Sequence, residues 1–350
     1  IMATTTTGCT FNVGSNHTDY LELYKHLNPD HIMSFGTKIE EDSMKQFYEK
    51  VEGTVGKTLV GKADFYCIQE GGQKDRPFLK AFDEALTESG DKRYTIVHYV
   101  DPSSGATGFD AAVILDNERY TDVVNRSFLV KKSNPHNGER VTKDVAVVTA
   151  VDRITKQPVV IASIHTPGYD LSLSPVPEEE SGYGVVFCEV VQEKLAELGK
   201  GRLQIIGADM NAKPEQEEMR FAAFTERSFT VLRSNASTDV NSWKSPTTGQ
   251  VIPERELDFL LVKDDSVVES DPMLAYQTKS TFSHIELEFD PITNCSDHVA
   301  PFFTISTEVV AFDQVEKEEE PTPEASVSTV GGFLQTASST VTAALSRFLF

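Results

Sequence analysis

The sequence predicts an α/β fold in which mixed β-sheets are covered by helices, and two observations lead to this prediction. Short apolar, β-branched runs bounded by Gly, Pro, Asp or Asn alternate along the chain with segments of helical periodicity. The strand candidates within residues 94–115 and 145–165 also follow one another with short connections, which favours antiparallel hairpins over a strict βαβ alternation. A sheet that contains both kinds of strand needs helices to cover its faces.

The expected elements follow one another in the order that such a fold needs. We expect strands at residues 64–68, 94–100, 111–115, 145–151, 159–165, 203–207, 257–262 and 300–305. We expect helices at residues 41–56, 77–88, 183–198 and 214–227. Pro214 suits the first turn of a helix, because the N–H group that proline lacks would have no partner there. Gly199 suits the position that follows the last residue of a helix.

Length and charge narrow the class of protein. With 350 residues, of which 39% are apolar and 25% are charged, the chain can bury a large core, and its composition excludes wholesale disorder. The formal net charge is -22 at pH 7. Such an acidic body offers no evident electrostatic footprint for a DNA backbone, although a local basic cleft would be compatible with it.

Targeting signals and cysteine usage predict an intracellular protein. No run of about 18 apolar residues is present, so we expect no ordinary transmembrane helix. Residues 1–13 lack the pattern of a secretory signal. Four cysteines are scattered along the chain without C-x-x-C spacing, at Cys9, Cys67, Cys188 and Cys295. We therefore expect neither a zinc site nor a disulfide framework, and we expect a reducing, cytoplasmic location.

The composition predicts three parts: a body at residues 1–312, an acidic, Pro-containing linker at 313–330, and an amphipathic helix at 331–350. In the last part, apolar residues recur at helical intervals. One interpretation is a frayed tail or a helix docked on its own domain. The alternative is a helix that lies on a membrane surface or binds a protein partner, and Arg347, its single basic residue, weakens the membrane version.

Five expected strand ends carry residues that bind metals or move protons. These residues are Glu70 after FYCIQ, His165 at the end of VVIASIH, Asp209 and Asn211 after QIIGA, Asp258 within LDFLLV, and Asp297 and His298 before VAPFF. Strand ends are suited to reactive groups, because loops there have free geometry on a rigid frame. Taken alone, each motif also has a common structural explanation, such as an Asx-turn at Asp209 or a hydrogen-bonded role for His165.

Three of these motifs carry a further physical expectation. A carboxylate that leaves a buried strand, such as Glu70, is costly unless it is paired or bound to a metal. A charge inside an apolar strand, such as Asp258, needs a partner, and histidine is a suitable one. Asp209 and Asn211 are two residues apart, so we expect both side chains to point to the same side of an extended segment.

The ordered set of motifs reads FNV, IQE, SIH, GADMN, LDF and SDH. This set resembles the endonuclease/exonuclease/phosphatase superfamily of metal-dependent phosphoesterases, from about Phe11 to Phe303. The resemblance implies the DNase I-like fold, a four-layer sandwich of two mixed β-sheets packed face to face and flanked by helices. It also implies a metal-dependent hydrolase that acts on phosphate ester bonds.

The resemblance implies a metal cluster. Glu70 would be the main Mg²⁺ ligand, with Asn12 nearby in the same cluster and Asp297 as the carboxylate beside the metal. Mn²⁺ is the alternative ion. Oxygen ligands without a cysteine cage suit Mg²⁺ or Mn²⁺ better than structural zinc.

The resemblance also implies a catalytic role for each remaining motif residue. Asp209 would accept a proton from the attacking water or orient it, and Asn211 would hold the phosphate or that water. His298 would bind a phosphoryl oxygen, with Asp258 fixing its ring, by the same logic as an Asp–His pair in a hydrolase triad. His165 would place a second imidazole near the leaving group or the phosphate.

Three features depart from the family pattern. Ser163 stands two residues before His165, where the family commonly has Asn, and this puts one phosphate or water contact in doubt. Ala208 separates the Gly and the Asp of the fourth motif. Asn12 lies near the start of the chain, so we expect its strand to be short.

The residues leave the substrate open among three hypotheses. The sequence favours a nuclease or nucleotide phosphodiesterase, and segment 108–120 resembles deadenylase-like members. The alternative is a phosphatase or phospholipase C-like enzyme acting on phosphoinositides or sphingomyelin-type lipids, which the terminal helix would suit. A non-catalytic scaffold would have lost a motif residue, and none is lost here. Trp243, Tyr169 and Phe109 could stack bases, but we expect them to pack locally.

Overall fold

The computed structural model describes the chain in several ranges. These are residues 2–14, 38–133, 140–167, 182–212, 214–234, 237–238, 243–244, 251–252, 255–264, 276–285, 296 and 298–311. The chain divides into two units, Ile1–Phe312 and Asp313–Phe350. The second unit lies outside the described residues, so the linker at 313–330 and the helix at 331–350 stay predictions.

The first sheet of the described chain contains six strands in the order β14-β15-β1-β2-β4-β3. Their bounds are β1 Met2–Asn12, β2 Phe65–Gln69, β3 Tyr94–Val100, β4 Thr107–Asp116, β14 Tyr276–Ile285 and β15 Phe302–Ala311. Strands β1 and β2 are parallel, and the other neighbours are antiparallel. The sheet is therefore mixed, and β3 and β4 form the antiparallel pair that the sequence predicts.

The second sheet has the order β10-β13-β9-β8-β7-β5, with β6 also paired to β7. The bounds are β5 Tyr120–Asn125, β6 Phe128–Ser133, β7 Arg140–Asp152, β8 Pro158–His165, β9 Leu203–Asp209, β10 Thr230–Leu232 and β13 Asp258–Asp264. Strands β8 and β9 are parallel, and β7 and β8 form the second predicted antiparallel pair. Two short strands, β11 Trp243–Lys244 and β12 Val251–Ile252, pair with each other.

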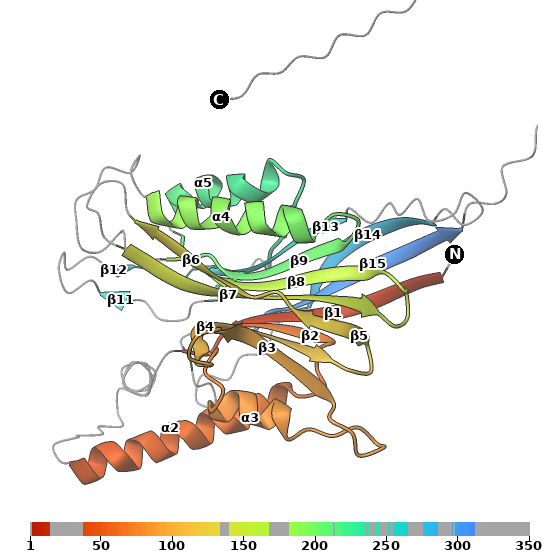
Figure 1. The fold of residues 1–350 in the computed structure, drawn as a ribbon. Helices are drawn as coiled ribbons and strands as arrows, with labels where there is room; N and C mark the ends of the chain where they lie inside the picture. Colours follow the sequence, from red (N-terminus) through yellow and green to blue (C-terminus); the bar gives the residue numbers. More distant parts are fainter. Residues whose placement is uncertain are drawn as a thin grey trace, which may run out of the picture. The chain divides into compact units, whose positions relative to one another are not determined.

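Alternating side chains explain why the sheets stack in layers. On β2, Phe65 and Cys67 pack against residues of the second sheet, whereas Tyr66 and Ile68 pack on the opposite face among helix residues. Helices α2 Lys38–Leu59 and α3 Pro77–Asp83 cover this outer face, and α4 Gly182–Leu198 and α5 Pro214–Thr225 cover the outer face of the second sheet (Figure 1). This arrangement confirms the predicted four-layer sandwich.

None of the helices in the described ranges is both long enough and apolar enough to cross a membrane.

Several observed elements are longer or shorter than predicted, and strands β5, β6, β10 and β14 were not predicted. Two of the differences in length have a clear cause. Strand β1 has 11 residues, so the prediction of a short strand before Asn12 was wrong. It is long because it pairs on both sides, with β15 along most of its length and with β2 near its end. Helix α3 ends at Asp83 rather than at residue 88, because Leu86 forms an antiparallel bridge with Lys92 and the chain between them turns back.

The Arg119–Tyr120 pair has a structural role. Arg119 Nη2 lies 2.7 Å from Asp152 Oδ2, and both side chains are buried. Tyr120 is buried in the core between the sheets. These two residues of segment 108–120 therefore stabilise the packing of the sandwich.

Close approach of the two sheets requires glycine at position 207. A Cβ atom there would lie 2.1 Å from Cys67 Cβ on the facing sheet. We expect Gly207→Ala to lower the free energy of unfolding by about 1–3 kcal/mol, the usual cost of overpacking a core, as measured by urea denaturation. Gly53→Ala in α2 is the matched control, since its nearest neighbour would be Pro77 at 3.8 Å and alanine favours a helix. Equal losses in both variants would contradict this explanation.

Candidate active site at the shared edge of the two sheets

Strand pairing brings the predicted site residues to one edge of the sandwich. In the first sheet, Asn12 at the end of β1 pairs with Gln69 at the end of β2. In the second sheet, Asp209 at the end of β9 lies between His165 of β8 and Asp258 of β13. Both parallel pairs end here, so that the carboxyl ends of four strands from two sheets meet at one edge.

The Asn12 side chain connects the two sheets. Its Nδ2 donates to Glu70 Oε1 at 3.1 Å and to Asp209 Oδ2 at 2.8 Å, and its Oδ1 accepts the N–H of Gly14 at 2.9 Å. The amide N–H₂ group, and not the carbonyl, thus faces the carboxylates. Two carboxylate oxygens from different sheets converge on one point, and oxygen donors of this kind are those that Mg²⁺ prefers.

Two site residues have a left-handed backbone, Glu70 with φ of 56° and Asn211 with φ of 43°. Such values are uncommon for residues other than glycine and gather at functional sites. The prediction that Asp209 and Asn211 share one side of an extended segment was wrong. The strand ends at Asp209, whose Oδ1 accepts the Asn211 N–H at 2.9 Å in a turn. That turn nevertheless directs the Asn211 amide to His165.

The imidazole of His165 is held on both sides. Its Nδ1 lies 2.5 Å from Asp110 Oδ1, and its Nε2 lies 2.8 Å from Asn211 Nδ2. The same Nε2 is 3.6 Å from Glu70 Oε1 and 3.7 Å from Asp209 Oδ2. The Asp110 contact therefore fixes the ring so that Nε2 faces the carboxylates of both sheets.

Neighbouring charges shift the pKa values in this cluster. Burial and the Lys143 charge would lower the pKa of His165, but the charge and hydrogen bond of Asp110 together with the charge of Asp209 raise it. Burial would raise the pKa of Asp110, but the charges of His165 and Lys143 bring that pKa down to about 2. Lys143 Nζ lies 2.6 Å from Asp110 Oδ2. The Asp110 carboxylate therefore lies between the Lys143 ammonium group and the His165 ring.

Sequence reasoning missed Asp110 and Lys143. Asp110 lies near the start of β4, and Lys143 lies in β7 of the other sheet. A signal for Asp110 was present, because it precedes the apolar run 111–115 just as Asp258 precedes its own run. Lys143 carries no such signal, since a lysine in an alternating strand usually faces solvent.

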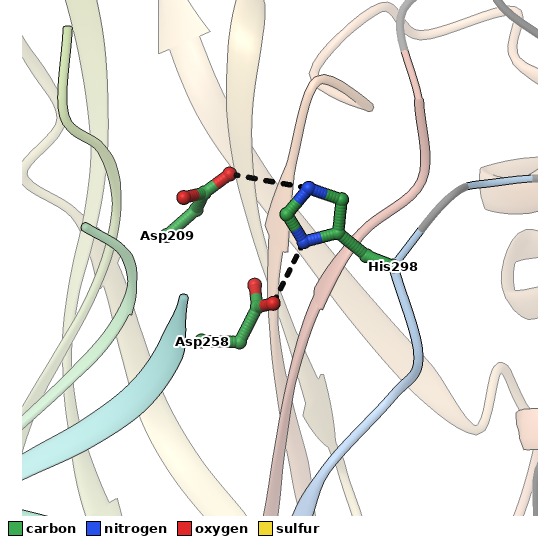
Figure 2. Close-up of side chains that lie close together, drawn as sticks. All are labelled: Asp209, Asp258 and His298. Atoms are coloured by element: carbon green, nitrogen blue, oxygen red, sulfur yellow. Dashed lines mark hydrogen bonds and ion pairs between the residues drawn. The ribbon is translucent and has the colours of Figure 1, made fainter. Parts of the chain in front are cut away.

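A second imidazole, that of His298, lies close to both Asp209 and Asp258 (Figure 2). His298 Nδ1 lies 2.7 Å from Asp258 Oδ2, and His298 Nε2 lies 3.8 Å from Asp209 Oδ2. All three side chains are buried. The partner that a charge at Asp258 requires is therefore His298, as the sequence predicts.

The three groups offer ligand atoms that all lie within 4.8 Å of one another, an arrangement that could hold a metal ion. The 2.7 Å contact between Asp258 and His298 favours a different interpretation. It occupies Nδ1 and fixes the ring, so that Nε2 faces Asp209. We therefore interpret the Asp258–His298 pair as an oriented imidazole rather than as a pair of metal ligands.

The two carboxyl groups that flank His298 differ in electrostatic environment. Burial raises the pKa of Asp258, and the facing His298 offsets this only in part. Burial acts in the same direction on Asp209, but His298, His165 and the Asn12 amide bring the pKa of Asp209 below its ordinary value. The surroundings of Asp209 thus favour its ionised form more strongly than the surroundings of Asp258 do, and environments that shift two carboxyl groups apart in this way are typical of sites where the two have different roles.

No protein-family model matches the chain, and the comparison with curated proteins gives no match either. Solved structures do match. A protein described as an endonuclease/exonuclease/phosphatase from Bacteroides vulgatus is 13% identical, with a TM-score of 0.51, and the alignment covers 88% of this chain and 100% of that one. The chain has the endonuclease/exonuclease/phosphatase fold. The human Nocturnin catalytic domain with a bound sulfate anion is also 13% identical, with a TM-score of 0.50 and coverage of 87% and 95%.

A third structure with this fold, a functionally unknown protein from Enterococcus faecalis, is 15% identical over 87% of this chain and 99% of that chain, with a TM-score of 0.50. The similarity to these three solved structures shows that the edge where the site residues meet belongs to a known fold.

The endonuclease/exonuclease/phosphatase fold places Ser163 away from the edge. Its Oγ donates to Ile68 O at 2.7 Å and accepts from Gln69 Nε2 at 3.1 Å, and the residue is fully buried. Ser163 therefore links the two sheets and does not face a substrate. Asp297 lies outside the described residues, so its predicted place beside the metal stays a prediction.

A pocket of about 550 Å³ opens beside Glu70 and His165. Phe109 lines it, and this residue is 70% exposed, so the prediction that Phe109 packs locally was wrong. Tyr169 and the side chain of Trp243 lie outside what the structure describes. The pocket has the size of a small-molecule site, and its position next to the carboxylates makes it part of the candidate active site.

Proposed function

We propose that the protein is a divalent-metal-dependent phosphoesterase that hydrolyses a phosphate ester by attack of water. One observation carries this proposal: two carboxylates, two imidazoles and two amides from both sheets converge at one edge. The residues are Asn12, Glu70, His165, Asp209, Asn211 and His298. The shared fold with proteins described as endonuclease/exonuclease/phosphatase supports the reaction class.

The donor set fits Mg²⁺, or Mn²⁺ in its place. Glu70 Oε1 is a hard oxygen donor at the edge of the pocket, and Asp209 Oδ2 contacts the same amide nitrogen of Asn12. Glu70 would hold the ion, with Asp297 as its predicted partner. Asn12 was predicted to lie in the same cluster, and its N–H₂ group would orient the carboxylates of Glu70 and Asp209. When bound, the ion supplies charge stabilisation for the phosphoryl oxygens and the leaving group.

The remaining side chains bind and orient the reactants. A carboxylate whose pKa is lowered is a weak base, so the environment of Asp209 favours orienting the attacking water over removing its proton. Asn211 donates through its amide, and His298 Nε2, with its ring fixed by Asp258, faces the same region. Both groups are suited to stabilise charge on phosphoryl oxygens. His165 stabilises the leaving group.

Two substrate classes enter the proposal. A nuclease or nucleotide phosphodiesterase stands first, and a phosphatase or phospholipase C-like enzyme for phosphoinositides or sphingomyelin-type lipids stands second. The cytoplasmic location, and the membrane or protein partner of residues 331–350, also remain proposals.

The test is hydrolysis with Mg²⁺ or with EDTA. The substrates are bis(p-nitrophenyl) phosphate, labelled single-stranded DNA and RNA, and vesicles that contain a phosphoinositide or sphingomyelin. We expect Mg²⁺-dependent turnover of at least one substrate, lost in EDTA and restored by Mg²⁺ or Mn²⁺. Glu70→Gln should lower it by at least the ~10–100-fold that loss of a metal's outer partner costs.

Glu84→Gln is the matched control, because Glu84 is an exposed carboxylate that pairs with Lys80 outside the site. It should retain full activity. Turnover that continues in EDTA and in Glu70→Gln, or absence of turnover with every substrate, would contradict the proposed function.

A further inference from the structure

The pocket beside Glu70 and His165 extends beyond the groups that the proposed mechanism uses. It continues between the hairpin of β3 and β4 on one side and strands β6 and β7 on the other. Its walls therefore include side chains with no part in water activation. These side chains are placed to contact the organic part of a substrate whose phosphate lies at the edge.

The backbone that carries Phe109 is held rigidly. The carboxylate of Asp144 accepts three successive N–H groups, those of residues 109–111, at 3.0 to 3.2 Å. The Phe109 carbonyl accepts the N–H of Gly72 at 3.2 Å. A Cβ atom at position 108 would lie 2.4 Å from Asp144 Oδ2, so Gly108 is what permits this carboxylate to approach. The backbone of Phe109 is thus fixed from both sides.

The ring of Phe109 is nevertheless 70% exposed at the pocket. An exposed phenylalanine forgoes most of the stabilisation that its burial would contribute to folding. A ring held on a rigid backbone loses little conformational entropy when a ligand covers it, so its burial is available to binding. Tyr99 and Leu129, both partly buried, extend the apolar wall.

The charges that line the pocket are mostly negative. Its lining contains four carboxylates and two cations, namely Glu70, Asp101, Asp110, Asp144, Arg76 and Lys143. Both cations are already held by carboxylates. Arg76 Nε lies 2.8 Å from Glu52 Oε1, and Lys143 Nζ lies 2.6 Å from Asp110 Oδ2. The His165 ring, which also lines the pocket, is held by Asp110 as well. A polyanion would find no uncommitted Lys or Arg among these lining residues, and beyond the ion that Glu70 would hold it would face the carboxylates of Asp101 and Asp144.

We propose that this pocket binds an uncharged or cationic organic group of a single-phosphate ester, with the Phe109 ring as its contact surface, and that its carboxylates select against substrates with a second phosphate. This inference rests on the proposed function. It narrows the substrate from a polynucleotide strand to a mononucleotide-like or other small ester with one phosphate.

The aromatic part is tested by steady-state hydrolysis of bis(p-nitrophenyl) phosphate, which presents a ring to the pocket in either orientation. Phe109→Ala should raise KM about tenfold, since stacking on an aromatic ring is worth ~1–3 kcal/mol, with kcat little changed. Phe109→Tyr should restore KM. Ile154→Ala is the matched control, because Ile154 is 58% exposed and does not line the pocket. An unchanged KM in Phe109→Ala would overturn the assignment of this ring.

The charge part is tested with two substrates that release the same group, thymidine 5′-(p-nitrophenyl phosphate) and its 3′-phosphorylated form. At low salt, the 3′-phosphate should lower kcat/KM about tenfold or more, because the carboxylates of the pocket would repel it and solvent would screen this repulsion only in part. Asp101→Asn should narrow this difference, because asparagine can keep the turn bond to the Ser103 N–H while it removes the charge. A 3′-phosphorylated substrate that is used equally well or better would overturn the selection.

A binding measurement separates failure of the inference from failure of the proposed function. Calorimetric titration of bis(p-nitrophenyl) phosphate into Asp209→Asn, with and without Phe109→Ala, needs no turnover. Weaker binding in the double variant supports the pocket even when hydrolysis is absent, in which case only the proposed function fails. Equal binding, or no binding to either variant, would overturn the pocket assignment. The proposed function would then still be judged by the hydrolysis assay alone.

Discussion

Asp209→Asn should lower the turnover of a phosphate ester by about 10²-fold or more, because Asp209 orients the attacking water and a misplaced reactant can cost that much. Asp209 is the carboxylate that the two halves of the site share, since it contacts Asn12 and faces both His165 and His298. Asparagine keeps the shape of the side chain and removes the charge that orients water. The measurement is kcat in Mg²⁺-replete buffer, on protein whose thermal unfolding shows an intact fold.

The control for Asp209→Asn is Asp116→Asn. Asp116 is also a buried carboxylate, but it pairs with Arg93 at 3.0 Å and takes no part in the site. Its replacement should reduce stability and leave kcat within a few-fold of the wild type. Full activity in Asp209→Asn would exclude the mechanism proposed for the edge, whatever the substrate.

Asp258→Asn should lower kcat by about 10²-fold or more while His298 remains present. The carboxylate of Asp258 fixes the His298 tautomer, and an amide there reverses the hydrogen bond or breaks it, as in a hydrolase triad. Nitrogen chemical shifts of the His298 ring, recorded by NMR, should report the changed tautomer. His298→Ala should lose activity to a similar extent, because the two residues act as one unit.

The same variant distinguishes the two interpretations of the Asp209, Asp258 and His298 group. If Asp258 only positions the imidazole, the Mg²⁺ concentration that gives half-maximal activity should stay the same in Asp258→Asn. A large rise in that concentration, with kcat restored at saturating Mg²⁺, would instead show that the group holds a metal ion. A wild-type kcat together with an unchanged tautomer would contradict both interpretations.

Local pattern was sufficient for the layers of this protein. Alternation of apolar side chains assigns Phe65 and Cys67 to one face of β2 and Tyr66 and Ile68 to the other, and burial on both faces then requires a layer on each side. The same reasoning marks the residues at which apolar strands stop. Strand β1, which ends at Asn12, is longer than the sequence predicts. It is longer because it pairs with β15, which lies far along the chain.

Local sequence pattern did not predict the conformation of the loops that follow the strands, nor the contacts between side chains of different sheets. The spacing of Asp209 and Asn211 suggests an extended segment, but a turn with a left-handed residue follows the strand. Asp110 shows the same limit, since its partner His165 lies 55 residues away on the other sheet. Whether such a pair forms depends on how the sheets are rotated and shifted against each other, and no local periodicity records that.

The sequence alone therefore sets most of the central strands, which of their faces are apolar, and which polar residues stand at their ends, because these properties repeat over a few residues. It missed strands β5, β6, β10 and β14, which pair on one side only. The tertiary structure sets which of those ends meet. Asn12 and Asp209 are 197 residues apart and lie 2.8 Å from each other only because two sheets with separate registers pack face to face. The exposed ring of Phe109 and the acidic pocket around it arise from the same packing, since they combine loops and strands of both sheets.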